Sequence, residues 1–98
     1  MLNDQKIEKF RQIVENKFQI YPNPSGDVFN VFYQSPPTNT PIRLSVKNIS
    51  GQIIFSKEYQ NFTGEIKDTI DLNSKAKGIY FVEMINGEMV ETKKIVLE

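Results

Sequence analysis

The chain has 98 residues, 12 of them basic and 12 acidic, so its formal net charge is zero and it has no basic block to neutralise nucleic-acid phosphates. It has neither cysteine nor histidine, which excludes disulfides, thiolate and imidazole metal sites, and the commonest nucleophile–base pairs of acyl-transfer enzymes. Hydrophobic residues make up 39%, without an apolar run near the ~20 residues of a membrane span. We therefore expect one folded domain with no enzymatic activity, cofactor, metal, nucleic-acid partner or membrane insertion.

The first residues have the periodicity of a short helix. Residues 4–16 repeat apolar side chains at a spacing near 3.6, beginning with Ile7 and Phe10. This pattern predicts an amphipathic helix with one thin apolar stripe. We interpret residues 1–17 as a linker or short helix and residues 18–98 as a β-sandwich domain.

Two prolines precede the first long strand, in the stretch YPNP. Pro22 and Pro24 each fix φ at about −65° and lack an N–H, so neither belongs in the middle of a sheet. Tyr21 and Asn23 stand before proline and are held extended. The stretch is therefore a stiff connector. It either marks the junction where a processing enzyme meets the domain, or it only stiffens the entry and blocks edge-to-edge pairing.

From residue 18 onward the hydrophobic period is two, which is typical of strands. Ser50-Gly51 and Asn86-Gly87 are predicted hairpin turns. The stretch PIRLSVKNI alternates between a buried and a wet face, and GIYFVEMI is apolar on both faces up to Glu83, which predicts a central strand. The prediction is all-β: an immunoglobulin-like antiparallel β-sandwich of about seven strands. The predicted strands are 18–21, 27–34, 42–49, 52–59, 65–72, 78–85 and 88–97.

Three aspartates are the best carboxylate candidates for a metal or catalytic site. Asp27, Asp68 and Asp71 lack the spacing of a calcium loop and the opposed cleft geometry of a glycosidase, so we expect them to face water. Aromatic residues expected at the surface do not form the stripe of a sugar-binding face. They are Tyr33, Tyr59 and Phe62.

Four motifs, taken in order, give the chain a family resemblance. YPNP, NISGQIIF, LNSKAKGIYFVEMINGE and KKIVLE together resemble the C-terminal sorting domain of type IX (Por) secretion cargo in Bacteroidetes, over residues 20–98. The chain departs from the family at Gln52, where arginine is frequent, and at Glu98, where many members end on a basic residue. The residues that match the sorting motif are Tyr21, Pro22, Asn23, Pro24, Gly51, Gly78, Tyr80, Lys94, Ile95, Val96, Leu97 and Glu98.

The resemblance implies a non-catalytic domain that directs a longer cargo protein through the type IX secretion system. The cargo would be periplasmic in transit, then on the outer-membrane surface or secreted, and its partners would be an outer-membrane translocon and a sorting protease. We expect the receptor to read the edge of the last strand together with its terminal carboxylate. Two alternatives stay open: an immunoglobulin-like adhesion or carbohydrate-binding module, and a structural spacer. An unpaired edge strand would also permit a weak homodimer.

A structural role is the alternative for several of these residues. Gly51 and Gly78 suit turns with positive φ. Tyr80 is expected in the core, with its hydroxyl bonded near the rim. Lys93 and Lys94 are adjacent and so face opposite sides of a strand. One of them contacts an acidic patch of the translocon, or both are solvated and protect an edge.

Overall fold

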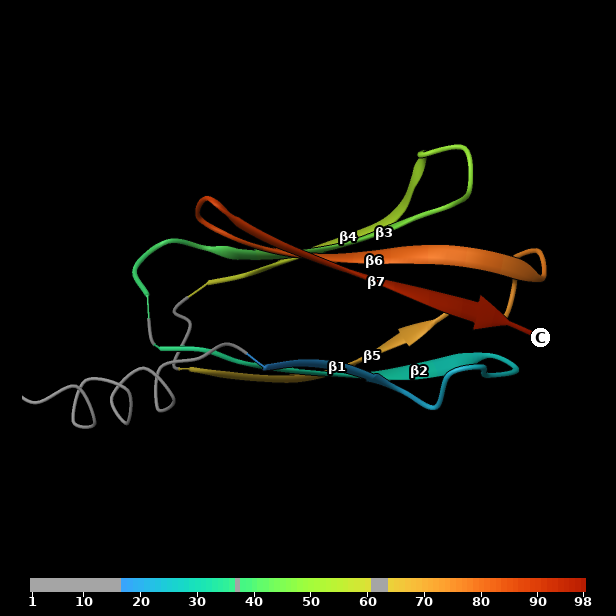
Figure 1. The fold of residues 1–98 in the computed structure, drawn as a ribbon, viewed down its shortest axis with the longest axis horizontal. Helices are drawn as coiled ribbons and strands as arrows, with labels where there is room; N and C mark the ends of the chain where they lie inside the picture. Colours follow the sequence, from blue (N-terminus) through green and yellow to red (C-terminus); the bar gives the residue numbers. More distant parts are fainter. Residues whose placement is uncertain (1–16, 37, 61–63) are drawn as a thin grey trace, which may run out of the picture.

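The computed structural model describes residues 17–36, 38–60 and 64–98, which form a sandwich of two antiparallel sheets (Figure 1). The three-stranded sheet has the order β1-β2-β5, and the four-stranded sheet has the order β4-β3-β6-β7. The predicted all-β, immunoglobulin-like fold with seven strands is confirmed. The strands are β1 (Lys17–Tyr21), β2 (Val28–Gln34), β3 (Ile42–Lys47), β4 (Ile53–Tyr59), β5 (Glu65–Asp71), β6 (Gly78–Asn86) and β7 (Met89–Leu97).

The predicted strand ends agree with the structure to within one residue, apart from the third strand. That strand was expected over 42–49 but ends at Lys47, because the side-chain oxygen of Asn48 accepts the N–H of Ser50 at 3.0 Å and closes a turn. Ser45, expected on the wet face of this strand, is buried between Ser56 and Glu83 on the neighbouring strands.

The predicted helix over residues 4–16 lies outside the described residues, as does Phe62. The first described residue, Lys17, is also the first residue of β1. Within the described part of the chain, no helix is long and apolar enough to cross a membrane.

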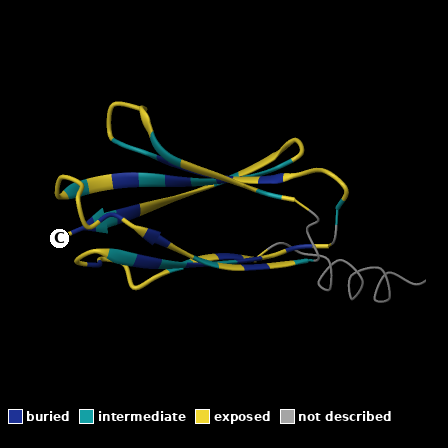
Figure 2. Cartoon of the chain, turned by 180° about the vertical axis from the view of Figure 1, so that it is seen from behind, coloured by how far each residue is buried: buried dark blue, intermediate teal, exposed yellow. Residues whose placement is uncertain are grey.

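The core lies between the inner faces of the two sheets, as the alternating colours along the strands show (Figure 2). β6 pairs with β3 on one side and β7 on the other, which confirms it as a central strand. Each large buried side chain contributes about 1.5–3 kcal/mol, so this layer supplies most of the favourable folding energy. The buried hydrophobic residues are Phe18, Phe29, Val31, Tyr33, Ile42, Leu44, Val46, Ile66, Ile70, Leu72, Tyr80, Val82, Met84, Ile95 and Leu97.

Tyr33 is part of this core, so its expected exposure is wrong. It is 1% exposed and lies on the same face of β2 as Phe29 and Val31. Its ring meets Phe18 edge-on, with centroids 6.1 Å apart, and its hydroxyl accepts a hydrogen bond from Nδ2 of Asn86 at 3.1 Å. The hydroxyl is therefore satisfied near the rim while the ring is buried.

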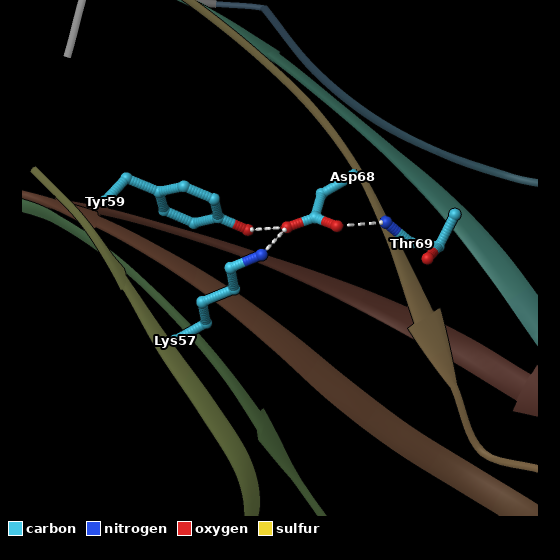
Figure 3. Close-up of polar contacts among 4 residues, drawn as sticks. All are labelled: Lys57, Tyr59, Asp68 and Thr69. Atoms are coloured by element: carbon cyan, nitrogen blue, oxygen red, sulfur yellow. Dashed lines mark hydrogen bonds and ion pairs between the residues drawn. The ribbon is translucent and has the colours of Figure 1, made fainter.

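Asp68 also faces inward rather than toward water, which corrects the expectation for this carboxylate. It lies on the inner face of β5, and its Oδ2 accepts hydrogen bonds from Nζ of Lys57 and from the hydroxyl of Tyr59, both at 2.7 Å (Figure 3). Lys57 and Tyr59 belong to β4, the edge strand of the other sheet, so the cluster ties the two sheets together along this side. By contrast, Asp27 and Asp71 are exposed and accept nearby main-chain N–H groups.

The environment of Asp68 shifts its acidity. Burial by itself would raise the pKa of this carboxyl, but hydrogen bonds from Lys57, Tyr59 and the N–H of Thr69, together with the charge of Lys57, outweigh burial and hold the pKa below its ordinary 3.8. The pKa of Tyr59 is raised, first by burial and then by the hydrogen bond to Asp68 and its negative charge. The cluster is therefore an anionic carboxylate with a neutral phenol at neutral pH.

We predict that Asp68→Asn lowers the free energy of unfolding by about 1 kcal/mol at neutral pH, because it removes the ion pair and weakens the bond from Tyr59. The depressed pKa stabilises the fold fully above 3.8, the ordinary pKa of the carboxyl, and this contribution is lost as the pH falls through the folded-state pKa. The difference between wild type and variant should therefore narrow in acid. Urea unfolding at a series of pH values from neutral to acid measures this difference in the free energy of unfolding. Asp71→Asn, at an exposed aspartate, is the control. A difference that does not change with pH would contradict the prediction.

Candidate functional site

Parts of all four motifs meet at one end of the sandwich. The β1–β2 connection with YPNP, the β3–β4 turn with NISG, the start of β6 and the end of β7 lie at the end marked C in Figure 1. The β6–β7 hairpin and the β2–β3 connection lie at the other end. Stretches that are distant in the sequence thus form a single region.

The outer edge of β7 is paired with the YPNP connection. Asn23 donates from Nδ2 to the carbonyl oxygen of Lys94 at 2.9 Å, and its Oδ1 accepts the N–H of Val96 at 3.0 Å. Ser25 continues the pairing, since its N–H donates to the oxygen of Val96 at 3.1 Å and its carbonyl accepts the N–H of Glu98 at 2.9 Å. The amide of one side chain thereby takes the place of a strand residue, and a short parallel bridge follows it. We call this pairing the Asn23 clamp.

The clamp closes the edge that the sequence led us to expect open. Because the N–H and C=O of Ser25 point to β7, those of its neighbours point away from it, and Pro24 has no N–H to offer a further strand. The peptide bonds before Pro22 and Pro24 are both cis. Because Asn23 and Ser25 are hydrogen-bonded to it, the edge of the last strand over Lys94–Glu98 is occupied by the chain itself.

Lys77 joins three segments at this end, a role that sequence reasoning missed. Its Nζ donates to a main-chain oxygen of Glu98 and to the carbonyl oxygen of Gly26 at 3.4 Å. The one local signal is its position directly before the Gly-X-Tyr motif. The ammonium fastens the start of β6 to the end of β7 and to the clamp.

The β3–β4 turn is heavily braced. The N–H of Asn48 donates to the carbonyl of Gln52 at 3.0 Å, the N–H of Gly51 donates to the carbonyl of Asn48 at 2.9 Å, and the side-chain oxygen of Asn48 accepts the N–H groups of Ser50 and Gln52. Gly51 has φ 84°, in the left-handed region that favours glycine. The turn presents Ile49, which is 74% exposed.

Tyr80 is buried at the start of β6, as the sequence predicted, and the partner of its hydroxyl is the carbonyl oxygen of Ala76, to which it donates. This is the arrangement called a tyrosine corner in immunoglobulin-like sandwiches. Gly78 in the same corner has φ 139°. A hollow of about 470 Å³ separates the corner from the β3–β4 turn. Its lining residues are Asn48, Ile49, Ser50, Ala76, Lys77, Gly78, Ile79 and Tyr80.

The residues of the terminal motif divide into two groups. Ile95 and Leu97 point into the core, whereas Lys94 and Glu98 are exposed and Val96 is half-buried on the outer face. A partner can therefore touch only the second group while the domain stays folded. Among the described residues, no group of three carboxylates, cysteines or histidines is placed to hold a metal ion.

Fold and site together define a small immunoglobulin-like sandwich whose first and last motifs meet along the edge of the last strand through side-chain and main-chain hydrogen bonds. A family model described as a secretion system C-terminal sorting domain matches residues 19–98. The chain belongs to this family, the type IX secretion sorting domains, and the resemblance seen in its motifs is confirmed. No curated protein sequence matches the chain. The family is in general non-catalytic, and its sorting tail implies a secreted or cell-surface protein.

We predict that Asn23→Ala lowers the free energy of unfolding by about 1–2 kcal/mol, because two hydrogen bonds to β7 are lost. The amide of Val96, which Asn23 now protects, should exchange with solvent faster, whereas that of Val82 in the middle of β6 should not change. Hydrogen exchange followed by NMR measures both. Asn23→Asp is the matched variant: it keeps an acceptor for Val96 and loses the donor to Lys94. Equal protection of Val96 in wild type and Asn23→Ala would show that the clamp does not hold the strand.

Proposed function

We propose that this domain is the address of a longer cargo protein. The type IX secretion machinery reads it and carries the cargo from the periplasm across the outer membrane, to the cell surface or the medium. The observation that supports this role most directly is the Asn23 clamp, which joins the first family motif to the last. The domain itself performs no chemistry.

A fixed tail explains why such an address is folded. The ends of a polypeptide commonly fray unless they are tied down. Here Asn23, Ser25 and Lys77 hold the main chain over Lys94–Glu98. A translocon that binds this end of the sandwich therefore meets groups already in position, and loses less conformational entropy than it would with a loose peptide.

A sorting protease would act on the chain ahead of the sandwich. From Lys17 onward the main chain pairs with β2, and a strand within a sheet is a poor protease substrate because cleavage requires an accessible, extended segment. Pro22 and Pro24 flank Asn23 of the clamp, which supports a role inside the domain rather than at a cleavage junction.

A carbohydrate-binding or adhesion role has less support. Such faces display exposed aromatic rings, but Tyr33 is buried and the hydroxyl of Tyr59 donates to Asp68. Tyr21 is exposed, at 53%, but it stands next to the clamp rather than in a row of rings.

The proposal is tested by secretion of a fluorescent reporter placed behind a signal peptide and ahead of residues 1–98, in a type IX-competent Bacteroidetes strain. We expect the reporter at the surface or in the medium with the intact domain, and in the periplasm when residues 94–98 are removed. Two controls separate address from folding: a strain without the translocon, and an unrelated immunoglobulin sandwich in place of the domain. Periplasmic retention with the intact domain, or export with the unrelated sandwich, would refute the proposal.

A further inference from the structure

The outer face of the four-stranded sheet carries an apolar patch at the end where the motifs meet. Ile79 lies beside Val96 on the next strand, and Phe81 follows Ile79 on the same face of β6. Ile49, from the braced turn, lines the same hollow as Ile79. Ile49 and Ile79 are 74% and 37% exposed, so the patch is open to solvent. We call Ile49, Ile79, Phe81 and Val96 the outer patch.

This patch is rigid as well as apolar. Hydrogen bonds from Asn48 hold the turn that carries Ile49, and the tyrosine corner holds the strand that carries Ile79. An isoleucine that is 74% exposed on a tight turn is unfavourable in water, and a rigid apolar anchor loses little entropy on binding. Both properties are those of a docking surface.

Lysines flank the patch. Phe81 pairs with Lys47 on β3 and with Lys94 on β7, and all three side chains project from the outer face. Lys47 is neutralised by Glu83, at 2.6 Å. In the described part of the chain the ammonium of Lys94 has no carboxylate partner, although the Asn23 clamp fixes its main chain. Among the described residues, Lys94 therefore brings an ammonium without a carboxylate partner to the edge of the apolar surface.

We propose that the outer patch docks an acidic, apolar segment of the secretion machinery. An apolar side chain of that segment enters the hollow between Ile49 and Ile79, and a neighbouring carboxylate pairs with Lys94. Charge complementarity supports this occupant, because a carboxylate is the group that the unpaired ammonium of Lys94 attracts. The inference rests on the proposed function and names the surface through which the domain is read.

Secretion of the full-chain reporter tests the charge requirement. We expect Lys94→Glu to reduce the secreted fraction about tenfold, and Lys94→Gln to reduce it less, since the first adds repulsion and the second only removes attraction. Lys93→Glu is the matched control, because this lysine is adjacent, also exposed, and points to the opposite face. Equal secretion of Lys94→Glu and wild type would overturn the inference. Unchanged thermal midpoints of the purified variants establish that folding is intact.

The apolar half of the site has its own test. Ile49→Ser should reduce secretion about tenfold, whereas Val90→Ser, on the same sheet face at the other end and 53% exposed, should not. The chain has no cysteine, so Ile49→Cys provides a single thiol for a photo-crosslinker in outer-membrane fractions from secreting cells. Linkage to an acidic, apolar peptide supports the inference. Linkage to a basic peptide or a second copy, or a yield no higher than with Val90→Cys, overturns it.

These outcomes separate the two levels of the proposal. If wild type is secreted and the patch variants are secreted equally well, the sorting role stands and the outer patch is not its docking surface. If wild type itself is retained while a known type IX cargo is exported from the same strain, the sorting role fails, and the docking inference fails with it.

Discussion

The pairing of Asn23 and Ser25 with the outer edge of β7 is the constraint on which the rest of this domain depends. It covers the outer edge of the last strand over Lys94–Glu98, and it fixes the main chain that carries both the buried pair Ile95 and Leu97 and the exposed Lys94. A side-chain amide is suited to this task because it carries one donor and one acceptor, as a peptide group does. Together, the first and last motifs of the family build one structural feature.

The opposite side of the sandwich addresses the same problem by different means. There the edge strands β4 and β5 belong to different sheets, and Asp68 bridges them through Lys57 and Tyr59. A charge that points inward on an edge strand also discourages pairing with a foreign strand. One side is therefore closed over Lys94–Glu98 by hydrogen bonds from Asn23 and Ser25, and the other side is bridged by a polar cluster.

The strands, the central position of β6 and the burial of Tyr80 were predictable, because alternation and turn residues act over a few neighbours. The burial of Tyr33 was not, since both faces of β2 carry apolar residues and alternation alone does not say which one points inward. Asp68 was missed because its charge masked its place in the inward register of Ile66 and Ile70. The clamp joins Asn23 to a residue 71 positions away, and no local pattern encodes such a contact.

That separation has a consequence for how the protein is made. A nascent chain cannot form the clamp until residue 94 has emerged from the ribosome, so this contact is among the last of the domain to become available. A cargo whose translation stops early would lack the clamp even if every preceding domain had folded. The clamp is therefore present only in molecules whose synthesis has reached β7, and incomplete molecules lack it.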